Sequence, residues 1–310
     1  MRLRAFQGEN VGGAAALLAE RHARHRAGEP LLAPLEDAQA EVERTWRAVG
    51  ASGAVALDGG EVVGYLLGSV RENEYWHKHV WVELAGHAAR EPELVRDLYR
   101  LAAERWVEEG AALHVALVPA LPELLEPWFR LAFAHMQAHA IRESGETARP
   151  LPAGLAIRAG TRDDLEAARP LLPLIWQHHR EPPTFTGIRL PPADEYLADW
   201  EETLEEEANI YFVAELGGAI VGHVLLNPEE PDLARPPGSV YLAVAASLPQ
   251  VRGRGVGVAL TDHALGWARE AGYRTVHTDW RVANLESSRF WPRRGFRETF
   301  YRLARRVGIG

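Results

Sequence analysis

Gln250-Val-Arg-Gly-Arg-Gly-Val-Gly257 stands between an apolar run, residues 240–246, and a helix-periodic run, residues 258–271. The first run predicts a buried strand and the second predicts a helix. Glycines let a backbone come close to a ligand because they carry no Cβ. A helix start offers N–H groups and the positive end of a dipole, and Arg252 and Arg254 add charge. The stretch therefore predicts a loop that binds an anion such as a pyrophosphate.

Two better-known glycine-rich loops have spacings that differ from this one. The dinucleotide fingerprint needs Gly-x-Gly-x-x-Gly with an acidic residue about 20 positions on, and the P-loop needs Gly-Lys followed by Ser or Thr. Read from Arg252, this loop is Arg-x-x-Gly-x-Gly. A flexible turn between a strand and a helix is the alternative interpretation of such spacing.

A second motif, Asn284-Leu-Glu-Ser-Ser-Arg-Phe-Trp-Pro-Arg-Arg-Gly-Phe296, has an asparagine, a short helix and a Gly-Phe strand entry. In this order the two motifs resemble those of the GCN5-related N-acetyltransferase (GNAT) family, over residues 155–305. The resemblance implies that acetyl-CoA is the co-substrate, with its pyrophosphate in the loop and its pantetheine arm near Asn284, and that no metal takes part. The implied cofactor-binding residues are Ser247, Leu248, Arg252, Gly253, Arg254, Gly255, Val256, Gly257, Asn284 and Ser287.

Length and composition fit a globular chain of two domains. The 310 residues suit two domains of about 150 each. No apolar run reaches the roughly 18 residues of a membrane span, and the N-terminus lacks the apolar core of a signal peptide. The absence of cysteine excludes disulfides and thiolate chemistry. We therefore expect a cytoplasmic protein without a membrane partner, either a monomer or a homodimer.

The net charge of −9 argues against a general nucleic-acid binder, which should be basic. We therefore expect no nucleic-acid partner. His178 and His179 are candidate metal ligands by residue type, but no spaced set of partner ligands accompanies them.

An internal repeat divides the chain. Residues 55–67 and 213–225 share seven identical positions, and each copy reads as strand, Gly-Gly turn, strand. The next strand recurs as 80–84 and 240–244, and the helices that follow end at Gly110 and Gly272. Trp128 and Trp291 then stand near the ends of matching helices. A chance likeness of two α/β hairpins is the alternative, but these four ordered correspondences favour duplication.

The repeat predicts an α/β (α+β) protein of two similar domains. Together with the resemblance, it implies two tandem GNAT folds, each a mixed, mostly antiparallel sheet flanked by helices. The expected division is a degenerate N-terminal domain, 1–145, a linker, 146–154, and an acetyl-CoA-binding domain, 155–310. This arrangement resembles the architecture of mycothiol-synthase-like acetyltransferases. In place of the glycine-rich loop the first repeat has residues 85–94, where Glu91 and Glu93 would repel a phosphate. We therefore expect one cofactor per chain.

Acetylation of an amine needs a base for the ammonium proton and N–H donors for the oxyanion. The resemblance implies that a strand bulge at Ala246-Ser-Leu248 offers such an N–H. Many family members have a tyrosine general acid where this chain has Trp291. Candidate acids or bases, by residue type, are Tyr241, His277, Asp279, Ser287 and Ser288. We select Asp279 and Tyr241 as the predicted catalytic residues and expect one of them to take part in proton transfer; the alternative for Asp279 is a structural bond to a loop or to Arg281.

The predicted helix over 194–209 has a strongly acidic face. Such a face either attracts a cationic amine or is a solvated helix surface. The resemblance implies an N-acetyltransferase that acetylates a primary amine of a small molecule. A non-catalytic acyl-CoA-binding regulatory protein is the alternative function.

Overall fold

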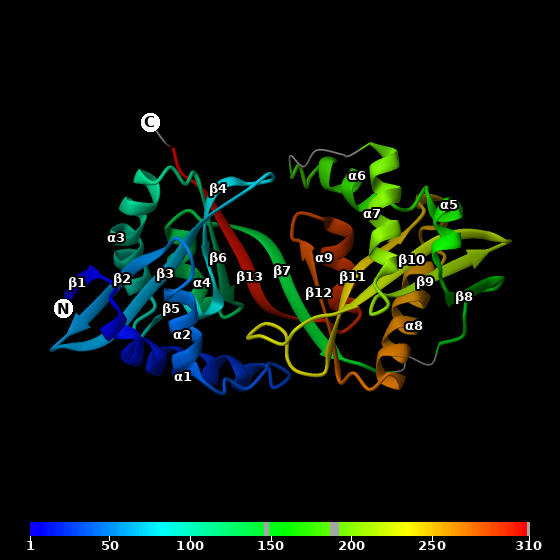
Figure 1. The fold of residues 1–310 in the computed structure, drawn as a ribbon. Helices are drawn as coiled ribbons and strands as arrows, with labels where there is room; N and C mark the ends of the chain where they lie inside the picture. Colours follow the sequence, from blue (N-terminus) through cyan, green and yellow to red (C-terminus); the bar gives the residue numbers. More distant parts are fainter. Residues whose placement is uncertain (146–148, 187–191, 309–310) are drawn as a thin grey trace. The chain divides into compact units, whose positions relative to one another are not determined.

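The computed structural model describes residues 1–145, 149–186 and 192–308. It divides the chain into two compact units (Figure 1). Unit 1 comprises Met1–His139, Asp232–Ala234 and Glu298–Gly310, and unit 2 comprises Ala140–Pro231 and Arg235–Arg297. Residues 146–148 of the expected linker lie outside the described part.

Unit 1 is built on the sheet order β1-β2-β3-β4-β6-β13-β7, with β5 added beside β3. The pairs β1–β2, β2–β3, β3–β4, β3–β5 and β6–β13 are antiparallel, and the pair β4–β6 is parallel. The element bounds are β1 Arg2–Ala5, α1 Val11–Gly28, α2 Ala38–Trp46, β2 Ala51–Asp58, β3 Glu61–Asn73, β4 His77–Val82, β5 His87–Ala89, α3 Leu94–Glu108, β6 Leu113–Pro119, α4 Pro122–Arg130, β7 Ala134–Glu143 and β13 Arg297–Arg306.

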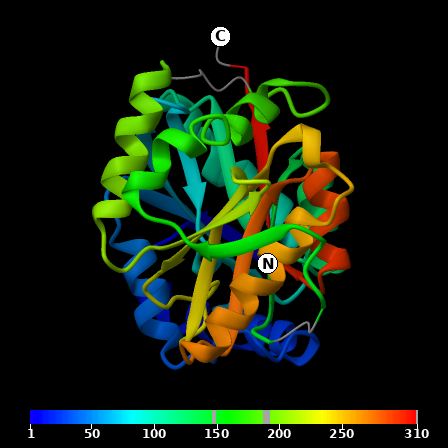
Figure 2. The same cartoon turned by 90° about the vertical axis from the view of Figure 1, so that its right-hand side faces the viewer.

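Unit 2 is built on the sheet order β8-β9-β10-β11-β12. Here β11 and β12 are the parallel pair, and Figure 2 shows them side by side in yellow and orange. The element bounds are β8 Leu155–Ala159, α5 Leu165–Ala168, α6 Leu174–Arg180, α7 Ala193–Glu205, β9 Ile210–Leu216, β10 Ala219–Pro228, β11 Ser239–Ser247, α8 Val256–Glu270, β12 Thr275–Arg281 and α9 Leu285–Arg293. Mixed, mostly antiparallel sheets with helices confirm the predicted fold class.

The two Gly-Gly turns explain why both predicted hairpins form. Gly59 and Gly60 have φ of 56° and 93°, and Gly217 and Gly218 have φ of 60° and 81°. Two successive residues with positive φ make the tight turn whose twist matches the flanking strands, and glycine adopts that region without strain. The β2–β3 and β9–β10 hairpins therefore follow from local sequence.

Helices cover both faces of the unit 2 sheet. A Cβ on Gly222 would lie 2.9 Å from Leu260 and 3.0 Å from Val256, so this residue faces α8. The next residue, His223, stacks on Trp200 of α7 with ring centroids 5.0 Å apart. Because successive strand residues point to opposite faces, α7 and α8 lie on opposite sides of β10.

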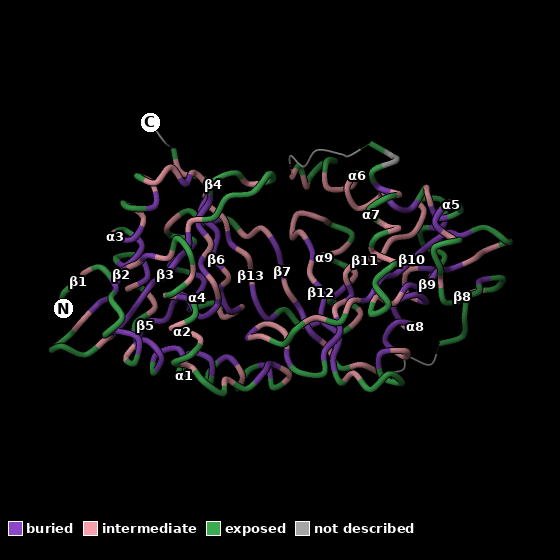
Figure 3. The backbone as a smooth tube through the Cα atoms, viewed as in Figure 1, coloured by how far each residue is buried: buried purple, intermediate pink, exposed green. Residues whose placement is uncertain are grey.

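Unit 1 has a core on each side of its sheet, and Figure 3 shows buried residues along its central strands. One cluster contains Leu98 and Trp106 of α3. The other contains Leu18 of α1, together with Leu233 from the β10–β11 connection and Phe300 of β13. No helix in the described ranges is long and apolar enough to cross a membrane.

The C-terminal strand lies differently from the expected division of the chain. We placed residues 155–310 in one domain, whereas β13 pairs with β6 of unit 1, from Phe300 opposite Pro119 to Arg306 opposite Leu113. Leu303 is fully buried in the core of unit 1. The apolar face of β13 has no partner nearby in the sequence. Its pairing with the distant strand β6 therefore determines which unit it joins.

Candidate functional site

The glycine-rich loop has an open side. It begins with a 3-10 turn, Pro249–Val251, and Gly253 and Gly255 have φ of 75° and 82°. Residues with a side chain are strained at such φ. A Cβ on Gly253 would meet nothing within 4 Å, and one on Gly255 would meet Pro152 Cγ at 3.2 Å. The backbone of this loop is therefore approachable by a ligand.

The start of α8 gives the loop its anion-binding character. The bond from Ala259 N to Gly255 O, 2.9 Å, closes the first turn. The amides of residues 255–258 precede that bond and have no carbonyl acceptor inside the helix. The first turn contains no acidic residue, and Arg252 lies beside it in an exposed ion pair with Glu286 at 3.1 Å. An incoming pyrophosphate would meet free amides and a guanidinium that it can attract from Glu286.

The bulge in β11 lies at Ala243, so its predicted place at 246–248 is wrong. The register passes from Leu225 opposite Val244 to Leu226 opposite Leu242, which leaves Ala243 as the extra residue. At the predicted place the backbone holds the strand end to its neighbour. Ser247 pairs with Gly222, and the amide of Leu248 donates to the carbonyl of Val221 at 2.9 Å.

Strand β11 parts from β12 just before the bulge. Within the described residues their ladder runs from Ser239 opposite Thr275 to Tyr241 opposite His277. Beyond it the Thr278 hydroxyl donates to the carbonyl of Leu242 at 2.9 Å. Residues 243–247 are partly exposed although they lie in mid-sheet. Alternate amides of this stretch point away from β10, where they are candidate donors for an oxyanion.

Tyr241 and Asp279, the predicted catalytic pair, meet at the end of this ladder. The Tyr241 hydroxyl donates to Asp279 Oδ2 at 3.2 Å, and both residues are partly exposed. Asn227 lies opposite Tyr241 in the β10–β11 ladder, on the same face of the sheet. The structure therefore brings together a hydroxyl and a carboxylate beside the point where β11 separates from β12.

His277 has both ring nitrogens engaged. Nδ1 lies 2.7 Å from Ser239 Oγ, and Nε2 lies 2.9 Å from Glu229 Oε2. Sequence reasoning missed both partners. Alternation along β11 places Ser239 on the face of Tyr241 and could have found it, whereas Glu229 lies beyond the end of β10 and no local spacing points to it.

The second motif forms α9 and its cap. Asn284 Oδ1 accepts from the amides of Glu286 and Ser287, both at 3.1 Å, and lies 3.0 Å from His178 Nε2. Ser288 donates to the carbonyl of Val282 at 2.8 Å. The roles of Asn284 and Ser287 toward a cofactor stay predictions.

Trp291 belongs to α9, and its side chain packs into the core. It is buried and makes edge contacts with Phe290 and Phe296, at centroid distances of 5.0 and 5.2 Å. Its indole therefore fills space rather than standing beside a reacting group.

His178 and His179 take different places. His178 bonds to Asn284, while burial, with a further contribution from Arg281, lowers the pKa of His179 to about 4. In the ranges that the structure describes, no three His, Asp or Glu side chains lie close enough to hold a metal ion.

The acidic residues of α7 divide into two sets. Glu201 and Glu205 pair with Arg162, at 2.9 and 2.8 Å. Others line a shallow hollow of about 450 Å³ formed by Asp199, Glu202, Thr203, Glu206, Asn209, Leu225 and Asn227. This hollow adjoins the catalytic candidates, because its residue Asn227 is the cross-strand neighbour of Tyr241.

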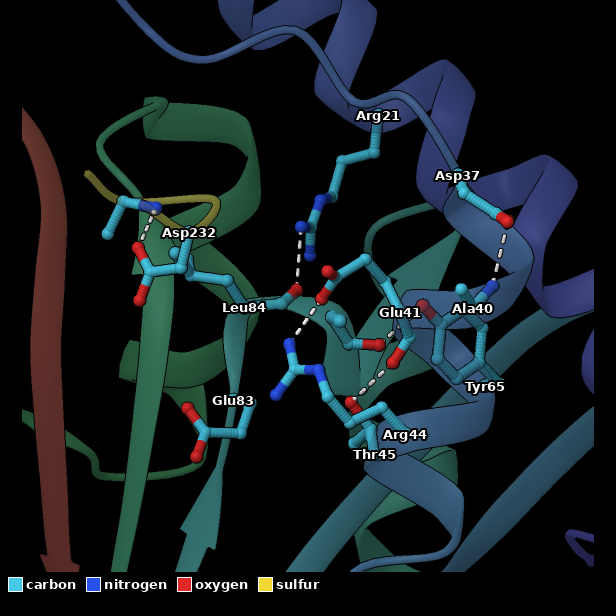
Figure 4. Close-up of polar contacts among 12 residues, drawn as sticks. Arg21, Asp37, Ala40, Glu41, Arg44, Thr45, Tyr65, Glu83, Leu84 and Asp232 are labelled. Carbon is cyan, nitrogen blue, oxygen red and sulfur yellow. Dashed lines mark hydrogen bonds and ion pairs between the residues drawn. The ribbon is translucent and has the colours of Figure 1, made fainter. Parts of the chain in front are cut away.

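The equivalent place in unit 1 is filled by the chain itself. After β4, a Cβ on Gly86 would lie 2.6 Å from the carbonyl oxygen of Leu67. Arg21 donates to the carbonyls of Leu84 and His87, the former at 2.7 Å (Figure 4). Burial lowers the pKa of Arg21 to about 10 and that of His87 to about 3. The loop of unit 1 is therefore packed onto its own sheet.

Comparisons with known proteins agree with this geometry. Residues 172–296 match the model of the Acetyltransferase (GNAT) family. A GCN5-related N-acetyltransferase from Sphaerobacter thermophilus superimposes with a TM-score of 0.62 at 18% identity, covering 99% of this chain and 96% of that one. A tandem GNAT protein from the clavulanic acid biosynthesis pathway gives a TM-score of 0.52 at 16% identity over the whole of both chains. At these identities the likeness concerns the fold. No curated protein sequence matches the chain.

Proposed function

We propose that this chain transfers the acetyl group of acetyl-CoA to a primary amine of a small molecule, because residues 172–296 match the model of the Acetyltransferase (GNAT) family. The observation that carries the proposal is the loop before α8. Its glycines leave an open side, its helix start has no acidic residue, and the strand before it has parted from β12.

The proposed cofactor site runs from the loop to β11. The amides of Gly253 and of residues 255–257, together with the side chains of Arg252 and Arg254, receive the pyrophosphate; the amide of Arg254 itself bonds to the carbonyl of Val251. The gap in pairing beyond Tyr241 receives the pantetheine arm, and Asn284 and Ser287 border it. The predicted contact through the amide of Leu248 is left out, because that amide already bonds to Val221.

The proposed reaction needs one proton transfer at each end. Asp279 accepts a proton from the ammonium of the acceptor, and the amine nitrogen then attacks the thioester carbonyl. The C–N bond forms, and an outward-facing β11 amide stabilises the oxyanion. The C–S bond then breaks, and the surplus proton that remains on the nitrogen passes through solvent to the departing thiolate. The thiolate of a thiol with a pKa of about 8.5 leaves without strong acid help. The reaction therefore does not require a tyrosine general acid at position 291, where this chain has tryptophan.

The acceptor is proposed to be a cationic small molecule. The hollow beside Tyr241 contains Asp199, Glu202 and Glu206. Carboxylates in a concave surface attract a positive ligand and raise its local concentration. An ammonium held there reaches the Tyr241–Asp279 pair one strand away.

Release of free thiol from acetyl-CoA, measured over a panel of small amines, tests the function. Amine-dependent release supports the proposed enzyme. Buried Trp291 favours a second candidate, an acyl-CoA-binding regulator. Acetyl-CoA binding without thiol release for any amine would favour the regulator, and absence of both binding and release would contradict both functions.

A further inference from the structure

His277 is a polar side chain near the proposed catalytic residues that is hydrogen-bonded through both of its ring nitrogens. Its two nitrogens bond to Ser239 and Glu229. Glu229 is held in turn by Arg235, whose Nη1 lies 3.2 Å from Glu229 Oε1. Two bonds on opposite sides of an imidazole fix both its tautomer and the orientation of its ring plane. The ring is therefore a rigid surface.

The ring of Tyr241 lies on that surface. The two rings are stacked, with centroids 5.1 Å apart and planes 15° from parallel. Such offset stacking is favourable by about 0.5–1.5 kcal/mol beyond the burial of area. Tyr241 and His277 also form the last pair of the β11–β12 ladder. The stacked His277 ring therefore supports the Tyr241 side chain at the point where the described ladder ends.

We infer that His277 is a positioning residue that holds the Tyr241 ring so that its hydroxyl meets Asp279. This rests on the proposed function, in which the Tyr241–Asp279 pair handles the proton of the acceptor. His277 itself exchanges no proton with the acceptor, because both of its nitrogens have partners. It acts through the tyrosine.

In unit 1, the strand position equivalent to His277 is not a histidine. Trp81 occupies the position in β4 equivalent to Tyr241, and its partner in β6 is Val115. A valine offers no ring face, and Trp81 stacks instead on Trp76 of its own hairpin, at 5.6 Å and 16°. Histidine is therefore not a requirement of the strand pairing.

Two variants separate the ring from its hydrogen bonds. His277→Phe and His277→Leu both lose the bonds to Ser239 and Glu229, but only phenylalanine keeps a flat face under Tyr241. We expect kcat of His277→Leu to fall about tenfold, the order seen for residues that orient a reacting group, and His277→Phe to stay within about threefold of the wild type. KM for acetyl-CoA should not change in either. In a Tyr241→Phe background the leucine variant should cause no further loss. Equal losses for both variants would overturn the inference.

A matched pair of charge variants checks the anchor. Glu229→Gln weakens the bond to His277 Nε2 and should lower kcat by roughly threefold, because a neutral acceptor holds the ring less firmly than a carboxylate. Glu230→Gln removes the same charge from the exposed neighbour and should leave kcat unchanged. An equal effect of the two variants would contradict the anchoring role.

A measurement without turnover separates this inference from the proposed function. In protein labelled with 13C at tyrosine Cζ, the Tyr241 signal is the one lost in Tyr241→Phe. We expect Asp279→Asn to shift that signal in the wild-type and His277→Phe backgrounds, and to leave it unmoved in His277→Leu. A shift of the same size in all three would overturn the positioning role. Absence of thiol release from the wild type, with the expected shifts present, would contradict the proposed reaction alone.

Discussion

The two units place different side chains at the same points of similar sheets. In unit 2, Tyr241 has Asn227 on one side and His277 on the other. In unit 1, Trp81 has Ser69 and Val115 in those places. The tyrosine and histidine of unit 2 are thus replaced by a tryptophan and a valine in unit 1, and only a serine there is polar.

The loops that follow β11 and β4 also differ, and the features that suit a ligand are again found in unit 2. Gly253 of unit 2 faces open space, whereas Gly86 of unit 1 lies against the backbone of Leu67. The helix α8 starts without an acidic residue, whereas α3 has Glu93 at its cap and Asp97 in its first turn. Unit 1 thus keeps the sheet and helices of unit 2 without the open loop and uncharged helix start that suit an anionic cofactor. This is possible because the residues that pack the fold differ from those that would bind the cofactor.

Replacing the carboxylate at the proton-transfer point should have the largest effect. Asp279→Asn keeps the size of the side chain and removes its basicity, so kcat/KM for the amine should fall by roughly a hundredfold to ten-thousandfold. CoA affinity by calorimetry should be unchanged. Asp163→Asn, an exposed aspartate of the same unit, is the control. A folded Asp279→Asn protein with normal turnover would remove this residue from the mechanism.

A negative side chain in the loop should have the next largest effect. Gly255 has a positive φ, so any residue there is strained, whereas Gly257 is helical and a Cβ would make an ordinary contact with Phe290 at 3.8 Å. Gly257→Glu should therefore fold and should weaken CoA by about a hundredfold through like-charge repulsion. Gly12→Glu, in an open position of unit 1, adds the same charge and should not alter affinity. Unchanged affinity in Gly257→Glu would refute the assignment of the loop.

Lowering the pH should have a smaller effect, a loss of folding stability that is greater in unit 1 than in unit 2. Burial lowers the pKa of His25, His87 and His114 in unit 1 to about 4, 3 and 4. In the unfolded chain these histidines have a pKa near 6.5, so the unfolded state binds more protons than the folded state between that pH and the lowered pKa values. Stability is therefore full above about pH 6.5 and falls toward pH 4, by up to about 1.4 kcal/mol per pH unit for each histidine.

Hydrogen exchange resolves that prediction by unit. Unit 2 contains two comparable histidines, His179 and His223, with pKa values lowered to about 4 and 3. We expect protection of β6 amides to decrease more between pH 7 and pH 5 than protection of β10 amides. Equal protection at both pH values, after correction for intrinsic exchange, would show that these histidines do not control stability.

Local sequence was enough to predict the hairpins and the position of the glycine-rich loop. The Gly-Gly pairs determine their own turns, and the Arg-x-x-Gly-x-Gly stretch leads directly into α8. Tyr241 and Asp279 were selected from strand positions alone, and the structure places them 3.2 Å apart. Their catalytic roles and those of the loop residues stay predictions.

Features set by pairing between distant strands could not be read from the sequence. The bulge at Ala243 depends on the register with β10, and nothing local distinguishes it from residues 246–248. The membership of β13 in unit 1 depends on β6, far away in the chain. Glu229 reaches His277 only because the connection after β10 folds back. Each error concerned which segments meet, not which segments form.

The number of CoA molecules bound per chain tests the difference between the units most directly. We would titrate CoA into the full-length protein and into Gly257→Glu by isothermal calorimetry. We expect one site per chain in the wild type and strong loss of that site in Gly257→Glu. Two sites per chain, or one site that Gly257→Glu leaves intact, would contradict the claim that unit 2 alone binds the cofactor.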